Sequence, residues 1–216
     1  MTTQIEILFE DEFLLVANKP VDLPVHVTVD PHRPHLQGLL ENQAQQKLVL
    51  FHRLDVDTTG VIILGKDPKI NGPMTALFHD RKIEKTYWAL VEGAWNPKDT
   101  KTESFIKKVS GGKWISAPKG AKNEHALTYF KLLEKRSQHS WIEAKPHTGR
   151  THQIRLHCRD LRHPIIGDRL YGKAHPRGVP IALHAHKIHF KHPITHKDLI
   201  IEAPKPPHWS FLESTS

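Results

Sequence analysis

The sequence predicts an α+β fold, with a mixed, largely antiparallel central sheet and flanking helices and loops. Short apolar runs bounded by turn residues outnumber segments with helical spacing, and the two kinds do not alternate regularly. The 216 residues suit one medium domain. A hydrophobic content of 38% with 25% charged residues is typical of a globular chain that buries a core.

The first fifth of the chain predicts a strand pair and a helix. Apolar runs at 5–9 and 13–17 flank an acidic turn, as in a pair of strands. Lys19-Pro20 ends the second run, and the proline-rich stretch from 24 to 34 indicates a loop. Leucines at three- and four-residue spacing then predict a helix over 36–46.

The next segment predicts two short buried strands, over 48–51 and 61–64, with Asp55 on the connection between them. A helix is expected over 73–81, with Pro73 in its first turn. A further strand is expected over 86–91. Connections held by rigid strands commonly carry functional groups, so this stretch is of interest.

Strands dominate the second half of the chain. A glycine pair at 111–112 predicts a hairpin turn. Ile154, Cys158 and Leu161 have helical spacing and predict a helix over 150–161. The expected strands are 104–109, 113–116, 126–133, 141–145, 181–190 and 199–203.

The charge balance favours a nucleic-acid partner. Lysine and arginine number 31 against 23 acidic residues, a formal charge of +8, and the sequence pI is about 9.5. No stretch approaches the roughly 18 apolar residues of a membrane helix. We see no secretory signal at the N-terminus. The single cysteine, Cys158, excludes an internal disulfide framework, so a cytoplasmic location is expected.

The tetrad His52-Arg53-Leu54-Asp55 is the most informative local feature. A buried carboxylate must be paired or hydrogen-bonded, so an Asp at this point is poor core material. An Asp held beside cations in a loop keeps its charge and is suited to chemistry. Taken alone, the short tetrad favours a structural salt bridge at a strand end. Asp57 is the local competitor, and we assign it the structural role.

Four segments follow one another along the chain: KP followed by His26, HRLDVDTTG at 52–60, KTYWALVEG at 85–93 and KPHTGRTHQIRLH at 145–157. HPIIGDRLYG and LHAHKIHF follow them. In their order and spacing these segments resemble the RluA-type RNA pseudouridine synthases over nearly the whole chain. The resemblance implies the pseudouridine synthase fold in a single catalytic domain, 1–216, as in short members without an N-terminal S4 domain.

The resemblance implies isomerisation of uridine in rRNA or tRNA, without metal or cofactor. Asp55 matches the catalytic aspartate, as a nucleophile or as a base toward the sugar. Tyr87 matches a tyrosine that stacks on the target base and accepts a proton; without this match, core packing is the favoured interpretation of a strand tyrosine. Arg150 matches the arginine that pairs with the aspartate. For an isolated TGR, a phosphate contact at a helix N-terminus is a reasonable alternative. Thr148 or Thr151 is expected to cap that helix, which gives the segment a structural role as well.

Further residues are expected to bind RNA or to pack the site. Arg53 matches an arginine that enters the RNA stack when the target nucleotide is flipped out. Leu183 matches an apolar residue beneath the site, and ordinary core is nearly as good an interpretation. The expected phosphate contacts are Arg155, Arg159 and Arg162, a basic stripe beside the apolar face of the 150–161 helix, of which some members are simply a solvated face. Lys107 and Lys108 lie on a hairpin for which an RNA-facing role and a merely solvated surface are about equally favoured by charge.

Two departures and two rival functions complete the expectations. Asp22 stands where the family often has glycine, and Thr59 where it usually has serine. His184 and His186 share a strand face, which raises a metalloenzyme as a rival. A non-catalytic RNA-binding or assembly factor fits the basic charge. A monomer without a protein partner or a membrane is expected to suffice.

Overall fold

The computed structural model describes residues 4–96, 99–109, 113–120, 124–172 and 179–209. The chain forms two compact units. Unit 1 comprises residues 1–84 and 184–206, and unit 2 comprises residues 85–183 and 207–216. Asp55 therefore belongs to unit 1, whereas Tyr87 and Arg150 belong to unit 2.

Unit 1 is a mixed sheet centred on β4 (Thr59–Gly65), in which every residue is buried. On one edge β4 pairs with β2, and on the other it pairs in parallel with the start of β10 and antiparallel with β3. The remaining pairs described in this unit, β1 with β2 and β10 with β11, are antiparallel. The bounds are β1 (Ile7–Glu10), β2 (Leu14–Lys19), β3 (Val49–Leu50), β10 (Leu183–Lys191) and β11 (Asp198–Glu202).

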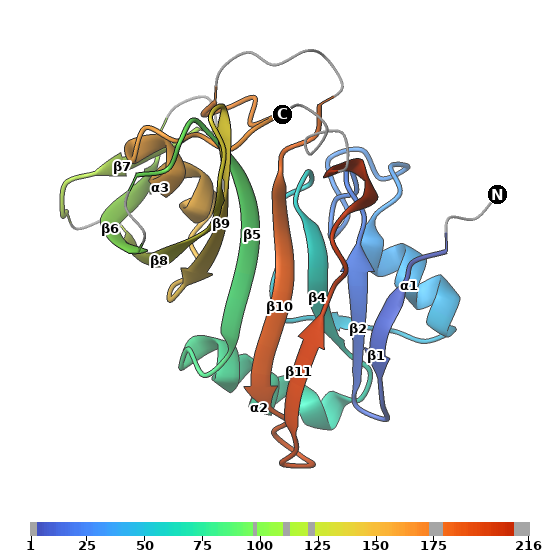
Figure 1. Ribbon diagram of the computed structural model, residues 1–216. Helices are drawn as coiled ribbons and strands as arrows, with labels where there is room; N and C mark the ends of the chain where they lie inside the picture. The colour runs from blue at the N-terminus through green and yellow to red at the C-terminus, as the bar shows by residue number, and fades with distance from the viewer. Residues whose placement is uncertain (1–3, 97–98, 110–112, 121–123, 173–178, 210–216) are drawn as a thin grey trace. The chain divides into compact units, whose positions relative to one another are not determined.

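Two helices accompany this sheet (Figure 1): α1 (Leu36–Ala44) and α2 (Pro68–His79). Helix α2 buries Ile70 and Met74 in the same apolar cluster as strand residues of β2, β4 and β10. It starts five residues before the expected point because the Asp67 carboxylate accepts a hydrogen bond from Lys69 N at 2.7 Å, with Pro68 at the first helical position. Pro73 therefore lies inside the helix, and its expected place in the first turn is wrong.

Unit 2 is an antiparallel sheet that curves around one helix, α3 (Gln153–Asp160), as Figure 1 shows. Its strands run in the order β5-β9-β8-β6-β7. The bounds are β5 (Glu84–Glu92), β6 (Asp99–Lys108), β7 (Trp114–Ala117), β8 (Glu124–Lys135) and β9 (His139–Pro146), followed at the C-terminal end by the 3-10 turn η2 (Pro207–Trp209).

Aromatic side chains form much of the core of unit 2. Trp88 on β5 meets Trp141 on β9 edge to face, with ring centroids 5.2 Å apart. Trp141 in turn meets Trp209 at 6.3 Å. Trp95 packs against Phe130 at 5.6 Å. Such tilted and edge-to-face pairs are the arrangements that aromatic rings prefer, so these contacts stabilise the unit beyond simple burial.

The predicted fold class is confirmed, and most elements lie within a few residues of their expected bounds. Two details are wrong: β3 is not buried, since Val49 is exposed, and α3 begins at Gln153 rather than at Arg150. The glycine turn at 111–112 lies outside the described residues. Over the described ranges, no helix is long and apolar enough to cross a membrane.

Candidate active site

Asp55 lies on the turn between β3 and β4. Its carbonyl accepts a hydrogen bond from Thr58 N at 3.1 Å, which closes the turn through Val56 and Asp57. Leu54 beside it is 7% exposed, whereas Arg53 is exposed and Asp55 itself is half-buried. The buried Leu54 side chain anchors the turn, while the Arg53 side chain remains accessible, as contact with RNA requires.

The strand that follows this turn is fixed where β4 meets β10. Gly60 has φ +109°, and a Cβ at this position would lie 2.2 Å from the Ala185 carbonyl oxygen, so only glycine fits. Next to it, Thr59 Oγ1 and His184 Nδ1 form a buried hydrogen bond of 2.8 Å. Threonine in place of serine thus retains the hydroxyl that this contact uses.

His184 and His186 are both engaged with the backbone of unit 1. His184 Nε2 lies 3.4 Å and His186 Nδ1 3.1 Å from the Ala203 carbonyl oxygen. In the part of the chain that the structure describes, no three His, Cys, Asp or Glu side chains are grouped to hold a metal ion. Among the described residues, His184 and His186 therefore belong to no such group.

Lys19 is a residue of this site that the sequence interpretation missed. Its side chain is fully buried, and Nζ donates to the carbonyl oxygens of Pro20 at 2.8 Å and Val56 at 2.7 Å. Burial lowers the pKa of Lys19 from 10.5 to about 8, against the opposing charges of Asp57, Asp55 and Asp22. The signal was present in the sequence, because a lysine lies two residues after an apolar run, at the end of the same strand.

Asp22 takes the backbone conformation that explains the glycine of the family pattern. Its φ is +57°, in the left-handed region that glycine, asparagine and aspartate tolerate best. Its carboxylate pairs with Arg33 at 3.1 Å on the surface. The departure from the pattern therefore keeps the turn and adds an exposed ion pair.

Tyr87 lies on β5 opposite Ala144 of β9 and is half-buried against the apolar core of unit 2. Two residues earlier, burial lowers the pKa of Lys85. Its Nζ lies 3.5 Å from where a Cβ on Gly149 would stand, so Lys85 lies beside the TGR turn. Leu183, the first residue of β10, is 4% exposed and belongs to the same core.

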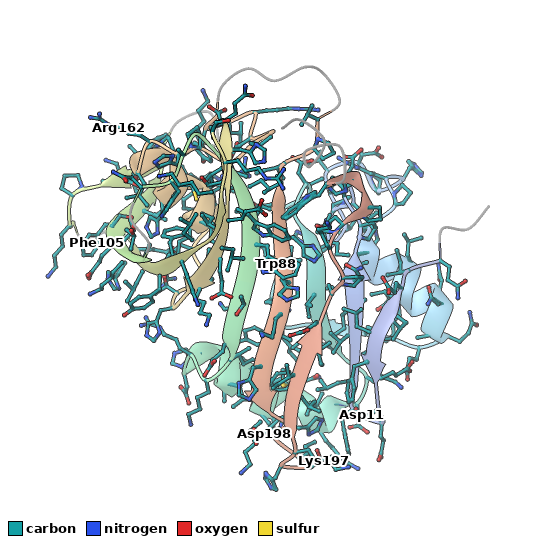
Figure 2. All side chains as sticks on the ribbon, in the orientation of Figure 1. Asp11, Trp88, Phe105, Arg162, Lys197 and Asp198 are labelled. Carbon is teal, nitrogen blue, oxygen red and sulfur yellow. The ribbon has the colours of Figure 1, made fainter. Side chains whose placement is uncertain are left out.

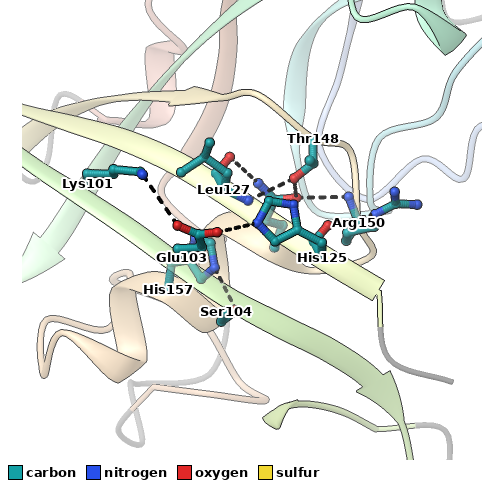
Figure 3. Close-up of polar contacts among 9 residues, drawn as sticks. Lys101, Glu103, Ser104, His125, Leu127, Thr148, Arg150 and His157 are labelled. Atoms are coloured by element: carbon teal, nitrogen blue, oxygen red, sulfur yellow. Dashed lines mark hydrogen bonds and ion pairs between the residues drawn. The ribbon is translucent and has the colours of Figure 1, made fainter. Parts of the chain in front are cut away.

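Arg150 is held by the beginning of β8. Its Nε donates to the His125 carbonyl at 3.1 Å, and Nη1 pairs with the Glu124 carboxylate at 2.5 Å. Its backbone N donates to Gln153 Oε1 at 3.0 Å (Figure 3). The Arg150 side chain is 34% exposed. The carboxylate that pairs with it within unit 2 is that of Glu124.

The start of α3 is fixed by a buried polar network rather than by a threonine cap. Thr148 Oγ1 accepts from Leu127 N and donates to Gln153 Oε1 at 2.6 Å (Figure 3). The cap position is His152, with φ +57° and no side-chain cap. The expected capping by Thr148 or Thr151 is therefore wrong, because Thr148 bonds the Gln153 side chain instead.

The same network continues along α3 to His157. Gln153 Nε2 donates to Thr128 Oγ1, which also contacts His157 Nδ1, each at 2.9 Å. His157 Nε2 lies 2.9 Å from Ser104 Oγ (Figure 3). Burial lowers the pKa of His157 from 6.5 to about 4, against the charge of Asp160. The ring is therefore neutral at pH 7.

Arg155 does not form part of an exposed basic stripe. It is 5% exposed, and its Nε and Nη2 each lie 2.8 Å from a different oxygen of Asp168. Tyr171 lies over the guanidinium, 5.2 Å from Cζ to the ring centroid. The expected surface phosphate contact is wrong for Arg155, because helical spacing alone could not show that this arginine faces the interior.

The other expected RNA contacts stay accessible in unit 2. Arg159 pairs with Asp160 at 2.6 Å and is partly exposed. Arg162 is exposed on the outside of the unit (Figure 2). Lys107 and Lys108 lie near the end of β6, half-buried and exposed respectively, opposite β7. Their positions suit phosphate contacts.

Comparison with known proteins gives a consistent result. Residues 13–160 match the model of the RNA pseudouridylate synthase family. A tRNA pseudouridine synthase C of Vibrio parahaemolyticus is 30% identical over 97% of this chain and 94% of the relative. A ribosomal large subunit pseudouridine synthase C of Vibrio cholerae is 34% identical over 94% of this chain, which spans 66% of that relative.

Solved structures agree with these matches. Human RNA pseudouridylate synthase domain containing 4 superimposes with a TM-score of 0.78 at 26% identity, over 96% of this chain and 93% of the other. Human RNA pseudouridylate synthase domain containing 1 gives 0.80 at 26% identity, over 95% and 85% of the two chains. The fold is the pseudouridine synthase fold, and the chain belongs to the RNA pseudouridylate synthase family.

Proposed function

We propose that this chain isomerises uridine in structured RNA to pseudouridine, with Asp55 as the catalytic carboxylate. The observation that carries the proposal is the turn at Asp55, which a buried hydrogen-bonded lysine and a buried leucine hold beside the strand β4. A turn fixed in this way presents a carboxylate in one orientation, which a chemical step requires.

The reaction redistributes bonds within one nucleotide. The bond from ribose C1′ to uracil N1 breaks, the uracil turns within the site, and C1′ bonds to C5. The hydrogen on C5 leaves as a proton, and N1 gains one, so the product is an isomer. Asp55 acts toward the ribose, either by bonding to C1′ or by removing a ribose proton. Tyr87 stacks on the uracil and accepts the C5 proton.

Two arginines are candidates for the cation that acts with Asp55. Arg150 is the sequence-based assignment, and it is 34% exposed and bonded to Glu124. Arg155 is the stronger candidate on burial, because its guanidinium is fixed in the interior by Asp168 and Tyr171. A preorganised, desolvated cation stabilises a carboxylate more than a solvated one does.

The RNA substrate is proposed from the relatives, two of which are named for tRNA and for the large ribosomal subunit. We propose a uridine in a stem-loop of one of these RNAs, acted on by a monomeric catalytic domain in the cytoplasm. Arg53, which is exposed, would replace part of the stacking lost when the target base leaves the helix.

The decisive variant is Asp55→Asn. It keeps the shape of the side chain and removes the charge, so pseudouridine formation is expected to fall below detection while RNA binding stays within about twofold. Tritium release from RNA labelled at uracil C5 measures the reaction. Asp57→Asn, in the same turn, is the matched control and should retain activity. An Asp55→Asn enzyme that modifies RNA at the normal rate would refute the mechanism.

A second experiment identifies the substrate and separates enzyme from binding factor. Pseudouridine positions in rRNA and tRNA are mapped in cells that lack this chain, and again after the chain or its Asp55→Asn variant is restored. Loss of one site that only the unaltered chain restores supports the proposal. An unchanged map, combined with RNA binding in vitro, favours the non-catalytic assembly factor.

A further inference from the structure

The segment that leads into the Asp55 turn has no regular secondary structure of its own. Residues 52–55 lie between β3 and β4 without helical or strand hydrogen bonding. Their position therefore depends on side-chain contacts with neighbouring elements. His52, three residues before Asp55, contacts β4 and α2 within unit 1.

The first contact is a hydrogen bond to the backbone of β4. Ile63 N donates to His52 Nε2 at 3.0 Å. On this edge of β4, β10 pairs with Thr59 and Gly60, and β3 pairs with Leu64 and Gly65. The His52 ring thus takes the place of a strand partner between these two pairings. Since Ile63 is fully buried, its N–H has a strong requirement for an acceptor.

The second contact orients the ring. His52 stacks on Phe78 of α2, with centroids 4.8 Å apart and planes 27° from parallel. Accepting a hydrogen bond at Nε2 requires a lone pair there, so the proton of the neutral ring is on Nδ1. The strand therefore restrains the ring along its edge, and the helix restrains it across its face.

We propose that His52 is a positioning residue for Asp55, acting as a side-chain substitute for a missing strand. The inference rests on the proposed role of Asp55. Three residues of extended chain span at most about 11 Å, so the position of the His52 ring limits where the Asp55 turn can lie. A shift of about 1 Å in a catalytic group reduces turnover by about 100-fold.

Two substitutions separate the acceptor from the ring. His52→Phe keeps the stacking on Phe78 and removes the acceptor, so kcat is expected to fall at least about tenfold with KM within about twofold. His52→Gln keeps an acceptor oxygen and is expected to restore kcat to within about threefold of the unaltered enzyme. The control is His79→Gln. His79 is an exposed histidine of α2, next to Phe78, and its replacement should change neither kcat nor KM.

Tritium release from a transcript that carries the mapped uridine gives kcat and KM, and amide hydrogen exchange at Ile63 reports the contact without activity. Slow exchange in the unaltered and Gln proteins with fast exchange in the Phe variant supports the inference. It is overturned if the Phe variant keeps normal kcat, if Gln and Phe lose kcat equally, or if Ile63 exchanges alike in all three. If the unaltered enzyme is inactive, the proposed function is refuted instead. Amide exchange at Ile63 then still tests the hydrogen bond from Ile63 N to His52 Nε2.

Discussion

Lys19 shows how one buried charge shapes the surroundings of the proposed catalytic residue. Its ammonium group is fully buried, and two carbonyl bonds and three nearby carboxylates oppose the penalty of burial without removing it. The group therefore holds the turn through Val56 and places positive charge near Asp55. Both effects depend on its protonation.

The stability of the protein is expected to rise between pH 8 and 10.5 because of Lys19. The folded-state pKa lies about 2.5 units below the unfolded value of 10.5, so the unfolded chain binds more protons across that range. The contribution is roughly 3 kcal/mol, from about 1.4 kcal/mol for each pKa unit. Denaturant unfolding of Lys19→Met at pH 8 and pH 10 should show a smaller rise than the unaltered protein. Lys69→Met, at an exposed position, should leave the rise unchanged.

The two candidate arginines are distinguished by conservative replacement. Arg155→Lys cannot keep the two-pronged bond to Asp168, so kcat is expected to fall about 100-fold or more. Arg150→Lys should mainly raise KM, since its partners lie at a half-exposed edge. Single-turnover kinetics measure both, with thermal unfolding as the check on folding. A larger loss of kcat in Arg150→Lys would establish Arg150 instead.

Sequence reasoning reached the turn at Asp55 because its motif is long and its residues are contiguous. It did not reach Lys19 or the burial of Arg155. Both depend on which neighbour a charged side chain meets, and Arg155 meets Asp168 thirteen residues away. Local spacing carries no record of such a partner, so a buried arginine and a solvated one have the same helical pattern.

The helix α3 is an unusual element because its N-terminus is fixed by buried side chains of the sheet. Gln153 and His157, one helical turn apart, share Thr128 of β8 as a partner. This network orients the segment that carries both Arg150 and Arg155. The element thus connects the stability of unit 2 to the proposed chemistry.

Acid is expected to destabilise α3 through His157. Its folded-state pKa of about 4 lies below the unfolded value of 6.5, so this stabilisation is full above pH 6.5 and is lost as the pH falls through 4. The loss is roughly 3 kcal/mol. Unfolding experiments at pH 7 and pH 4 should show a smaller loss for His157→Gln than for the unaltered chain. His32→Gln, in an exposed loop, should behave like the unaltered chain.

At the level of elements, apolar periodicity located nearly every strand, and the errors have physical causes. The start of α2 was misplaced because Pro68 and Pro73 compete as first-turn prolines, and the Asp67 cap decides between them. The exposure of β3 was missed because a two-residue strand is too short to show alternation. Such details depend on capping and pairing partners that a pattern does not name.

Across the whole molecule, the charge of +8 should govern how tightly RNA binds. Affinity is expected to fall linearly on a plot of log K against log salt. Arg162→Gln, at an exposed position of unit 2, should reduce the slope by about one without changing kcat. Filter binding over a salt series measures the slope. An unchanged slope would remove Arg162 from the phosphate contacts.

The aromatic core of unit 2 has a consequence for optical spectroscopy. All five tryptophans and all three tyrosines of the sequence lie between residues 85 and 183 or after residue 206, and therefore in unit 2. Unit 1, which carries Asp55, contains neither, so it is silent in intrinsic fluorescence. A fluorescence melt therefore follows one unit alone. A single tryptophan introduced into unit 1 would show whether the two halves unfold together.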